Sequence, residues 1–188
     1  AYIKHPDENI NVVVQAGLLS LAAHAYNRSS IEPAGIVAVD PETDDLSLFP
    51  FIYWPMTDSS PRLSPLARQN IQTYMGGGGL PVIDIVDGTL ASSDNIHTLL
   101  EDIQAGPFEI VEEGHLLTQS FYLTQDLPGV ANRDVLAERI PEEQERVRMT
   151  SIIVSDQNWT AAWTGRSIGP DIHEDALRAG LNRSEERR

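Results

Sequence analysis

One stretch of the chain, Leu46–Gly88, constrains the fold more than any other. Residues 48–54 form an apolar, aromatic-rich run of the kind found in buried strands, and residues 80–86 form a second one. Between them, Ser64 and Pro65 are residue types that favour the N-cap and the first position of a helix. The segment therefore predicts a strand, a helix and a second strand, and this βαβ unit favours a parallel sheet.

The four consecutive glycines at 76–79 are the part of this segment that most resembles a functional motif, because glycine-rich loops bind phosphates. Such a loop lies between a strand and the helix that follows it, so that the helix N-terminus faces the anion. Here the glycines follow a predicted helix and precede a predicted strand, and no Gly-Lys-Ser or Gly-Lys-Thr comes after them. They predict the end of a helix rather than a phosphate site.

The rest of the chain continues the alternation of strands and helices. Further strands are expected at 2–4, 36–39, 108–111 and 150–155, and further helices at 12–26, 95–104 and 173–181. Residues 133–148 fit either a surface helix or a long loop, and residues 156–169 are expected to form a loop that carries two tryptophans. We therefore expect an α/β fold, a three-layer doubly wound sandwich with a mainly parallel sheet. It would form a single domain over residues 1–181, followed by a charged tail at 182–188.

Composition excludes several classes of function. The 188 residues include 28 acidic and 13 basic side chains, a formal net charge of −15, whereas nucleic acids and anionic membranes require clustered Lys and Arg. The chain has no cysteine, so disulfides, cysteine-ligated zinc and cysteine nucleophiles are all excluded. It also has no run of about 18 apolar residues, so we expect no direct membrane insertion by this segment. The sequence indicates no cofactor and no dedicated metal site.

Polar and aromatic side chains gather where the predicted strands end. In a parallel sheet these carboxyl ends share one edge, which is where ligands bind. We therefore expect a cleft for an unidentified small molecule or protein partner, and its candidate residues are Tyr53, Trp54, Asp84, Asp87, Asn158 and Trp159. A structural explanation is also open, because Asp87-Gly88-Thr89 is a good turn sequence and the tryptophans equally suit a hydrophobic core.

Asp87, His115 and Asp156 are the candidates for catalytic groups. If they converge, they suit a hydrolase that could depend on a divalent metal ion, because carboxylates and histidine serve as acids, bases and metal ligands. Five histidines are scattered through the chain, which gives His115 no special weight. A non-enzymatic binding or interaction module is therefore our first hypothesis, and the hydrolase is the alternative.

Four motifs occur in the order expected of a bacterial family known as domain of unknown function 4159. They are FPFIYWPMT, SPLARQNIQTYMGGGGLPVIDIVDG, HLLTQSFYLTQDLPG and SDQNWTAAW. The opening Ala1-Tyr2-Ile3 and the later Ala179-Gly180-Leu181-Asn182 are also similar to the ends of that family, so the resemblance covers most of the chain.

The resemblance implies a flavodoxin-like fold similar to that of class I glutamine amidotransferases. It also implies a place in a membrane-anchored envelope protein, on an undetermined side of the membrane, and a chain that starts directly in a strand is expected of such a segment. Those amidotransferases carry a nucleophilic cysteine in the turn that corresponds to Asp87-Gly88-Thr89. Its absence here excludes a thiol-based glutaminase. The resemblance further predicts Asn-Asp-Trp where this chain has Gln157-Asn158-Trp159, which weakens a role for Asp156.

Overall fold

The computed structural model describes residues 1–29, 32–112, 115–119, 127–131, 133–139, 151–165 and 169–185. The helices in these ranges are α1 (Glu8–Arg28), α2 (Pro65–Gly76), α3 (Asp94–Asp102), α4 (Leu116–Gln119), α5 (Trp159–Trp163) and α6 (Pro170–Glu185), with short 3-10 helices η1 (Leu46–Leu48) and η2 (Leu90–Ser92). The strands are β1 (Tyr2–Ile3), β2 (Ala38–Val39), β3 (Phe51–Met56), β4 (Leu80–Ile85), β5 (Phe108–Ile110), β6 (Leu136–Glu138) and β7 (Ile153–Ser155).

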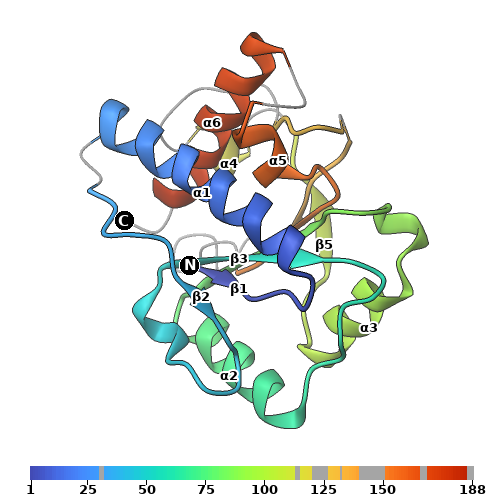
Figure 1. The fold of residues 1–188 in the computed structure, drawn as a ribbon. Coiled ribbons are helices and arrows are strands. Elements are labelled where there is room, and N and C mark those ends of the chain that lie inside the picture. The colour runs from blue at the N-terminus through green and yellow to red at the C-terminus, as the bar shows by residue number, and fades with distance from the viewer. Residues whose placement is uncertain are drawn as a thin grey trace.

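The strands form one sheet in the order β2-β1-β3-β4-β7-β6-β5. The first five in this order are parallel to one another, and β6 and β5 extend the sheet as an antiparallel pair. Helices α1, α4, α5 and α6 lie on one face of the sheet, and α2 and α3 lie on the other (Figure 1). The predicted α/β class and the mainly parallel sheet are thereby confirmed.

The alternation of side chains along the strands divides the hydrophobic core between the two faces. Tyr53 and Val82 pack with residues of α1, α5 and α6, whereas Trp54 and Ile83 pack with residues of α2 and α3. Adjacent residues of one strand therefore belong to different cores, and this separates two of the predicted site residues, Tyr53 and Trp54.

The central unit β3–α2–β4 forms as predicted. The Ser64 hydroxyl accepts a 3.1 Å hydrogen bond from the Ala67 N–H and so caps α2. The glycines end this helix: Gly78 has a φ of +92°, and a Cβ on Gly79 would lie 2.1 Å from the Tyr74 ring. Strand β3 begins at Phe51 rather than at residue 48, because Leu48 is the last residue of η1.

Two predictions for the C-terminal part of the chain were wrong. Within 133–148, residues 136–138 form strand β6 rather than a helix or a loop, and residues 140–150 lie outside the described residues. Residues 159–163 form helix α5 instead of a loop. Neither element has a local signal, because β6 is three residues long and α5 is capped by a carboxylate that lies 75 positions earlier in the chain.

Both long helices that cover the upper face of the sheet in Figure 1 extend beyond their predicted bounds. Helix α1 begins at Glu8 because the Asp7 carboxylate caps it, accepting a 2.8 Å hydrogen bond from the Asn9 N–H. Helix α6 continues to Glu185, into the predicted tail. Among the described residues, no helix is both long and apolar enough to cross a membrane.

Candidate functional site

The topology creates a crevice between β1 and β3. The two strands are parallel neighbours, but β1 leads into α1 on one face of the sheet and β3 leads into α2 on the other (Figure 1). The loops that leave their carboxyl ends therefore diverge. A divergence of this kind is a topological switch point, and ligands of open α/β sheets bind in the crevice beside it.

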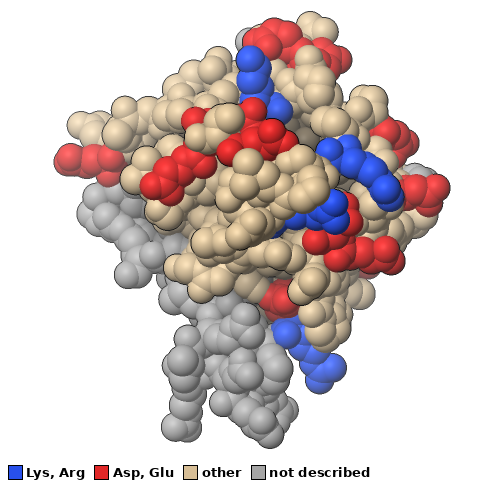
Figure 2. Space-filling model, turned by 90° about the horizontal axis from the view of Figure 1, so that it is seen from below, with Lys and Arg blue, Asp and Glu red and all other residues tan. Residues whose placement is uncertain are grey.

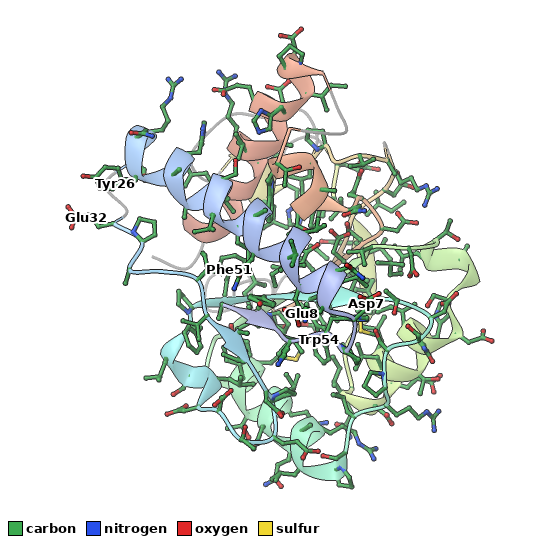
Figure 3. All side chains as sticks on the ribbon, in the orientation of Figure 1. Asp7, Glu8, Tyr26, Glu32, Phe51 and Trp54 are labelled. Carbon is green, nitrogen blue, oxygen red and sulfur yellow. The ribbon has the colours of Figure 1, made fainter. Side chains whose placement is uncertain are left out.

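A cavity of about 720 Å³ lies at this switch point. The β1–α1 loop, the acidic loop after β2 and the β3–α2 loop supply its walls. Figure 3 shows Trp54 below the sheet and beneath the start of α1, where Asp7 and Glu8 lie, and both Trp54 and Glu8 line the cavity. Its charged lining residues are Lys4, Glu8, Asp40, Glu42, Asp44 and Arg62.

His5 connects the two diverging loops at the base of this cavity. Its side chain is only 4% exposed, and its Nε2 atom lies 3.1 Å from Thr57 Oγ1 and 3.2 Å from Ser60 Oγ. The Ser60 hydroxyl also accepts a 3.0 Å hydrogen bond from the Thr57 N–H. On the other side, the Asn11 side chain bonds both the N–H and the carbonyl of His5. The histidine thus ties the start of α1 to the loop after β3.

The hydrogen bonds of His5 determine which ring nitrogen carries the proton. Nδ1 accepts a 3.0 Å hydrogen bond from the Asp7 N–H, so in the neutral ring Nε2 must be protonated and must donate to the hydroxyls of Thr57 and Ser60. A general base needs the reverse, a bare nitrogen facing the hydroxyl. The contact between His5 and Ser60 is therefore a structural link and not a nucleophile–base pair.

Asp84 is the centre of a second polar network, at the carboxyl ends of β4 and β7. Its carboxylate accepts hydrogen bonds from the Tyr53 hydroxyl at 2.6 Å and from the Ser155 hydroxyl at 3.0 Å. The N–H groups of Asn158 and Trp159, at the start of α5, donate two more at 3.1 and 2.7 Å. Four residues predicted for the cleft therefore meet here: Asp84 itself, Tyr53, Asn158 and Trp159.

Burial dominates the electrostatics of this network. It raises the pKa of Asp84 from 3.8 to about 6, although four hydrogen bonds oppose that shift. Burial and the adjacent Asp84 charge raise the pKa of Tyr53 well above its usual value. Perturbed acids often mark functional sites, but Tyr53, Asp84 and Trp159 are each 0% exposed. This network therefore joins β3, β4, β7 and α5 from within, and its central carboxylate has no surface that is open to a ligand.

The other candidates from the sequence lie around this network. Asp156 is largely buried and holds two loops together, because its Oδ2 atom accepts hydrogen bonds from the Leu90 N–H at 3.0 Å and from Arg133 at 2.9 Å. The Asn158 amide donates a 3.2 Å hydrogen bond to the Val86 carbonyl. Asp87 is exposed in the bend after β4.

His115 lies apart from these carboxylates, at the start of α4. Its Nδ1 atom accepts a hydrogen bond from the Leu117 N–H at 3.2 Å, and its Nε2 atom is 3.9 Å from Glu109 Oε1. Burial lowers its pKa. Among the described residues, which include Asp87, His115 and Asp156, no three histidine or carboxylate side chains form a group that could hold a metal ion.

Sequence reasoning missed the residues at the switch point. His5 is in a loop that follows a two-residue strand, and Thr57 and Ser60 belong to a stretch that has only turn character. The contact between the loops depends on the pairing of β1 with β3, whose residues are about fifty positions apart in the chain. Of the predicted cleft residues, Trp54 in β3 lines this cavity.

The comparisons with known proteins agree with the sequence motifs, and they assign no biochemical activity to the chain. A search of the curated proteins finds no match. A sequence model of the family described as domain of unknown function (DUF4159) matches residues 1–183. This match covers nearly the whole chain and includes every strand and helix that contributes to the cavity and to the Asp84 network. The protein therefore belongs to the DUF4159 family.

Proposed function

We propose that this domain is a non-enzymatic binding module that takes a small polar molecule into the switch-point cavity. The observation behind the proposal is that a cavity of about 720 Å³ lies beside the switch point between β1 and β3, a position where the topology of a parallel sheet favours ligand binding. Its volume is within the usual range for small-molecule sites, about 300–1,000 Å³.

The lining supports a ligand that is neutral or cationic. Of its charged residues, Glu8, Asp40, Glu42 and Asp44 are acidic, and only Lys4 and Arg62 are basic. The chain as a whole has a net charge of −15, and acidic side chains are spread over the face of the molecule seen in Figure 2. An anionic ligand would meet repulsion at this site, so amines and hydroxyl-rich neutral molecules are the favoured classes.

Several features favour binding over catalysis. The turn at Asp87-Gly88-Thr89 has no nucleophile of the amidotransferase kind, and His5 donates its proton to the neighbouring hydroxyls. The candidates Asp87, His115 and Asp156 do not gather into a metal-binding group. The order of the first four strands, β2-β1-β3-β4, supports the proposed likeness to flavodoxin-like proteins and to class I glutamine amidotransferases, but that fold hosts many functions.

Tryptophan fluorescence tests this proposal directly. The chain has three tryptophans, of which Trp159 and Trp163 are fully buried on the α1 side of the sheet, whereas Trp54 lines the cavity. A polyamine, amino-sugar or neutral-sugar panel is titrated while emission and melting temperature are recorded. We expect at least one amine or polyol to shift both signals, and phosphate esters to shift neither. A panel that moves neither signal at millimolar concentrations would contradict the proposal.

Two exposed carboxylates provide a matched pair of variants for that experiment. Glu42→Gln removes a carboxylate from the rim of the cavity, and Glu101→Gln removes one from α3, outside the cavity lining. We expect the first variant to weaken the binding of a cationic ligand several-fold and the second to leave it unchanged. Equal effects of the two substitutions would show that the ligand responds only to net charge.

We also propose, from the family resemblance, that the domain is part of a membrane-anchored envelope protein in a bacterium. Fractionation of cells that express the full-length parent tests the proposal, because detergent should be needed to release the domain from membranes. Recovery of the full-length parent in the soluble fraction without detergent would overturn it.

A further inference from the structure

Two basic side chains line the switch-point cavity, and within the described part of the chain neither has a carboxylate partner. They are Lys4 and Arg62. All other Lys and Arg side chains that the structure describes lie within 4.0 Å of an Asp or Glu carboxylate; these are Arg28, Arg68, Arg133, Arg139 and Arg178. In a chain with 28 acidic and 13 basic residues, unpaired cations at one cavity indicate a place for the anionic group of a ligand.

Arg62 is the better placed of the two to bind such a group. It lies in the loop between β3 and α2, and its one hydrogen bond to the described residues is long, with Nη2 3.5 Å from Thr98 Oγ1. A guanidinium presents its N–H groups as a planar fork that matches the two oxygens of a carboxylate. The start of α2 adds positive potential, since Ser64 and Ala67 also line the cavity. This wall of the cavity therefore suits a carboxylate.

The acidic loop after β2 forms the opposite wall. Strand β1 lies between β2 and β3, so this loop and the loop of Arg62 leave the sheet two strand spacings apart, or about 10 Å. Asp44 Oδ2 accepts a 2.7 Å hydrogen bond from the Asp40 N–H, and Asp40 Oδ1 accepts a 2.8 Å hydrogen bond from the Glu42 N–H. These two carboxylates hold the shape of the loop. The Glu42 carboxylate has no such bond among the described residues and is available for a cation.

We propose that the cavity binds a small zwitterion of the amino-acid class, with its carboxylate on Arg62 and its ammonium group on the acidic loop at Glu42. The inference rests on the proposed function and narrows it. A zwitterion has no net charge, so a chain with a net charge of −15 does not repel it as it repels a simple anion. A simple amine would leave Arg62 without a partner, and a neutral sugar would leave both walls without a counter-charge.

Matched ligands test the need for both charges. The amino acids β-alanine, γ-aminobutyrate and ε-aminocaproate are titrated by calorimetry, each beside the amine and the carboxylic acid of the same chain length. We expect at least one amino acid to bind more than about tenfold more tightly than both of its partners, because only the zwitterion forms charge-assisted hydrogen bonds at both walls. An amine that binds as tightly as its amino acid would overturn the inference and leave the proposed function standing. If no compound binds, the inference falls, and the sugar and polyamine panel decides the proposed function separately.

Substitution of Arg62 tests its role in binding the carboxylate. Arg62→Gln should lower the affinity for the amino acid to about that for the amine, and it should not weaken binding of the amine itself. Arg139→Gln is the control, because Arg139 is exposed, lies outside the cavity lining and gives the same change in charge. Arg62→Lys retains the charge without the fork and should keep part of the preference. Equal effects of the two glutamine variants, or a loss of amine binding in Arg62→Gln, would overturn the inference.

Discussion

The Tyr53 hydroxyl donates a 2.6 Å hydrogen bond to the Asp84 carboxylate, and neither side chain has any exposed surface. The pair connects the adjacent strands β3 and β4, and Asp84 extends the connection to β7 and to the start of α5. Buried polar groups that are fully hydrogen-bonded specify a unique arrangement of the elements around them. We therefore regard this pair as the part of the network that positions α5 on the sheet.

Removal of the Tyr53 hydroxyl should destabilise the protein without changing its shape. Tyr53→Phe leaves the ring in place but takes one donor from a buried carboxylate, so we expect the free energy of unfolding to fall by about 1–3 kcal/mol at pH 7. Urea denaturation measures the change. Tyr26→Phe is the control, because Tyr26 is 65% exposed and its substitution should have little effect. A Tyr53→Phe protein as stable as the wild type would show that the hydrogen bond is not needed.

The raised pKa of Asp84 makes stability depend on pH in a definite direction. Its pKa is about 6 in the folded chain against 3.8 in the reference, so the folded state retains a proton that the unfolded state has lost. The contribution of this group is fully present below about pH 4 and is lost as the pH rises through about 6. Its size is on the order of 3 kcal/mol.

Asp84→Asn isolates that contribution, because asparagine does not titrate. We expect the stability of the wild type relative to Asp84→Asn to decrease as the pH rises from about 4 to about 7, as followed by urea denaturation at each pH. The other carboxylates contribute equally to the pH dependence of stability in both proteins, so their contributions cancel when the two stabilities are subtracted. A difference that does not vary with pH would contradict the raised pKa.

Prediction from the sequence succeeded where structure is specified by neighbouring residues. The Ser64–Pro65 start of α2, its glycine end and the flanking apolar strands are local signals, and each was confirmed. Helix α5 failed because its cap is Asp84, which comes from another strand. Five residues are too few to form a stable helix without tertiary contacts, so no local pattern predicts a helix at this position.

Prediction of the site was limited in the same way, because local sequence signals do not specify contacts between distant segments. The strand-end rule pointed to the edge of the sheet at which the switch-point cavity lies, and Trp54 lines that cavity. The rule could not tell which side of each strand faces a ligand, so it grouped Trp54 with Tyr53, which lies in the opposite core. His5 and Thr57 were missed because their contact depends on the pairing of β1 with β3.

Gly17 marks a close approach that should not tolerate a side chain. A Cβ at this position would lie 2.3 Å from the Thr160 carbonyl oxygen, where α1 crosses α5. We expect Gly17→Ala to force the helices apart and to lower the melting temperature by several degrees, because backbone atoms cannot rotate away as a side chain would. Gly76→Ala is the control: a Cβ there meets nothing within 4 Å, and alanine favours the helical state. We expect this variant to be neutral or slightly stabilising, and a tolerated Gly17→Ala would contradict the tight packing.

Asp156 should act as a structural tie between loops. Its hydrogen bonds from the Leu90 N–H and from Arg133 connect the segment after β7 with the segment after β4 and with the segment before β6. Asp156→Ala should therefore raise amide hydrogen exchange around residues 86–92 and cost about 1–3 kcal/mol. Asp102→Ala, which removes an ion pair with Arg68 whose carboxylate is more exposed than that of Asp156, should cost less. Unchanged exchange at 86–92 in Asp156→Ala would show that the tie is not needed.

The two short outer strands have a consequence for the behaviour of the protein in concentrated solution. The sheet ends with β2, which has two residues, and with β5, which has three. Strands this short offer few free N–H and C=O groups, so they are poor templates for β-sheet growth between molecules. The acidic loop next to β2 adds repulsion against an approaching strand. Short edge strands of this kind therefore oppose the edge-to-edge pairing that leads to fibrous aggregates when the protein is concentrated.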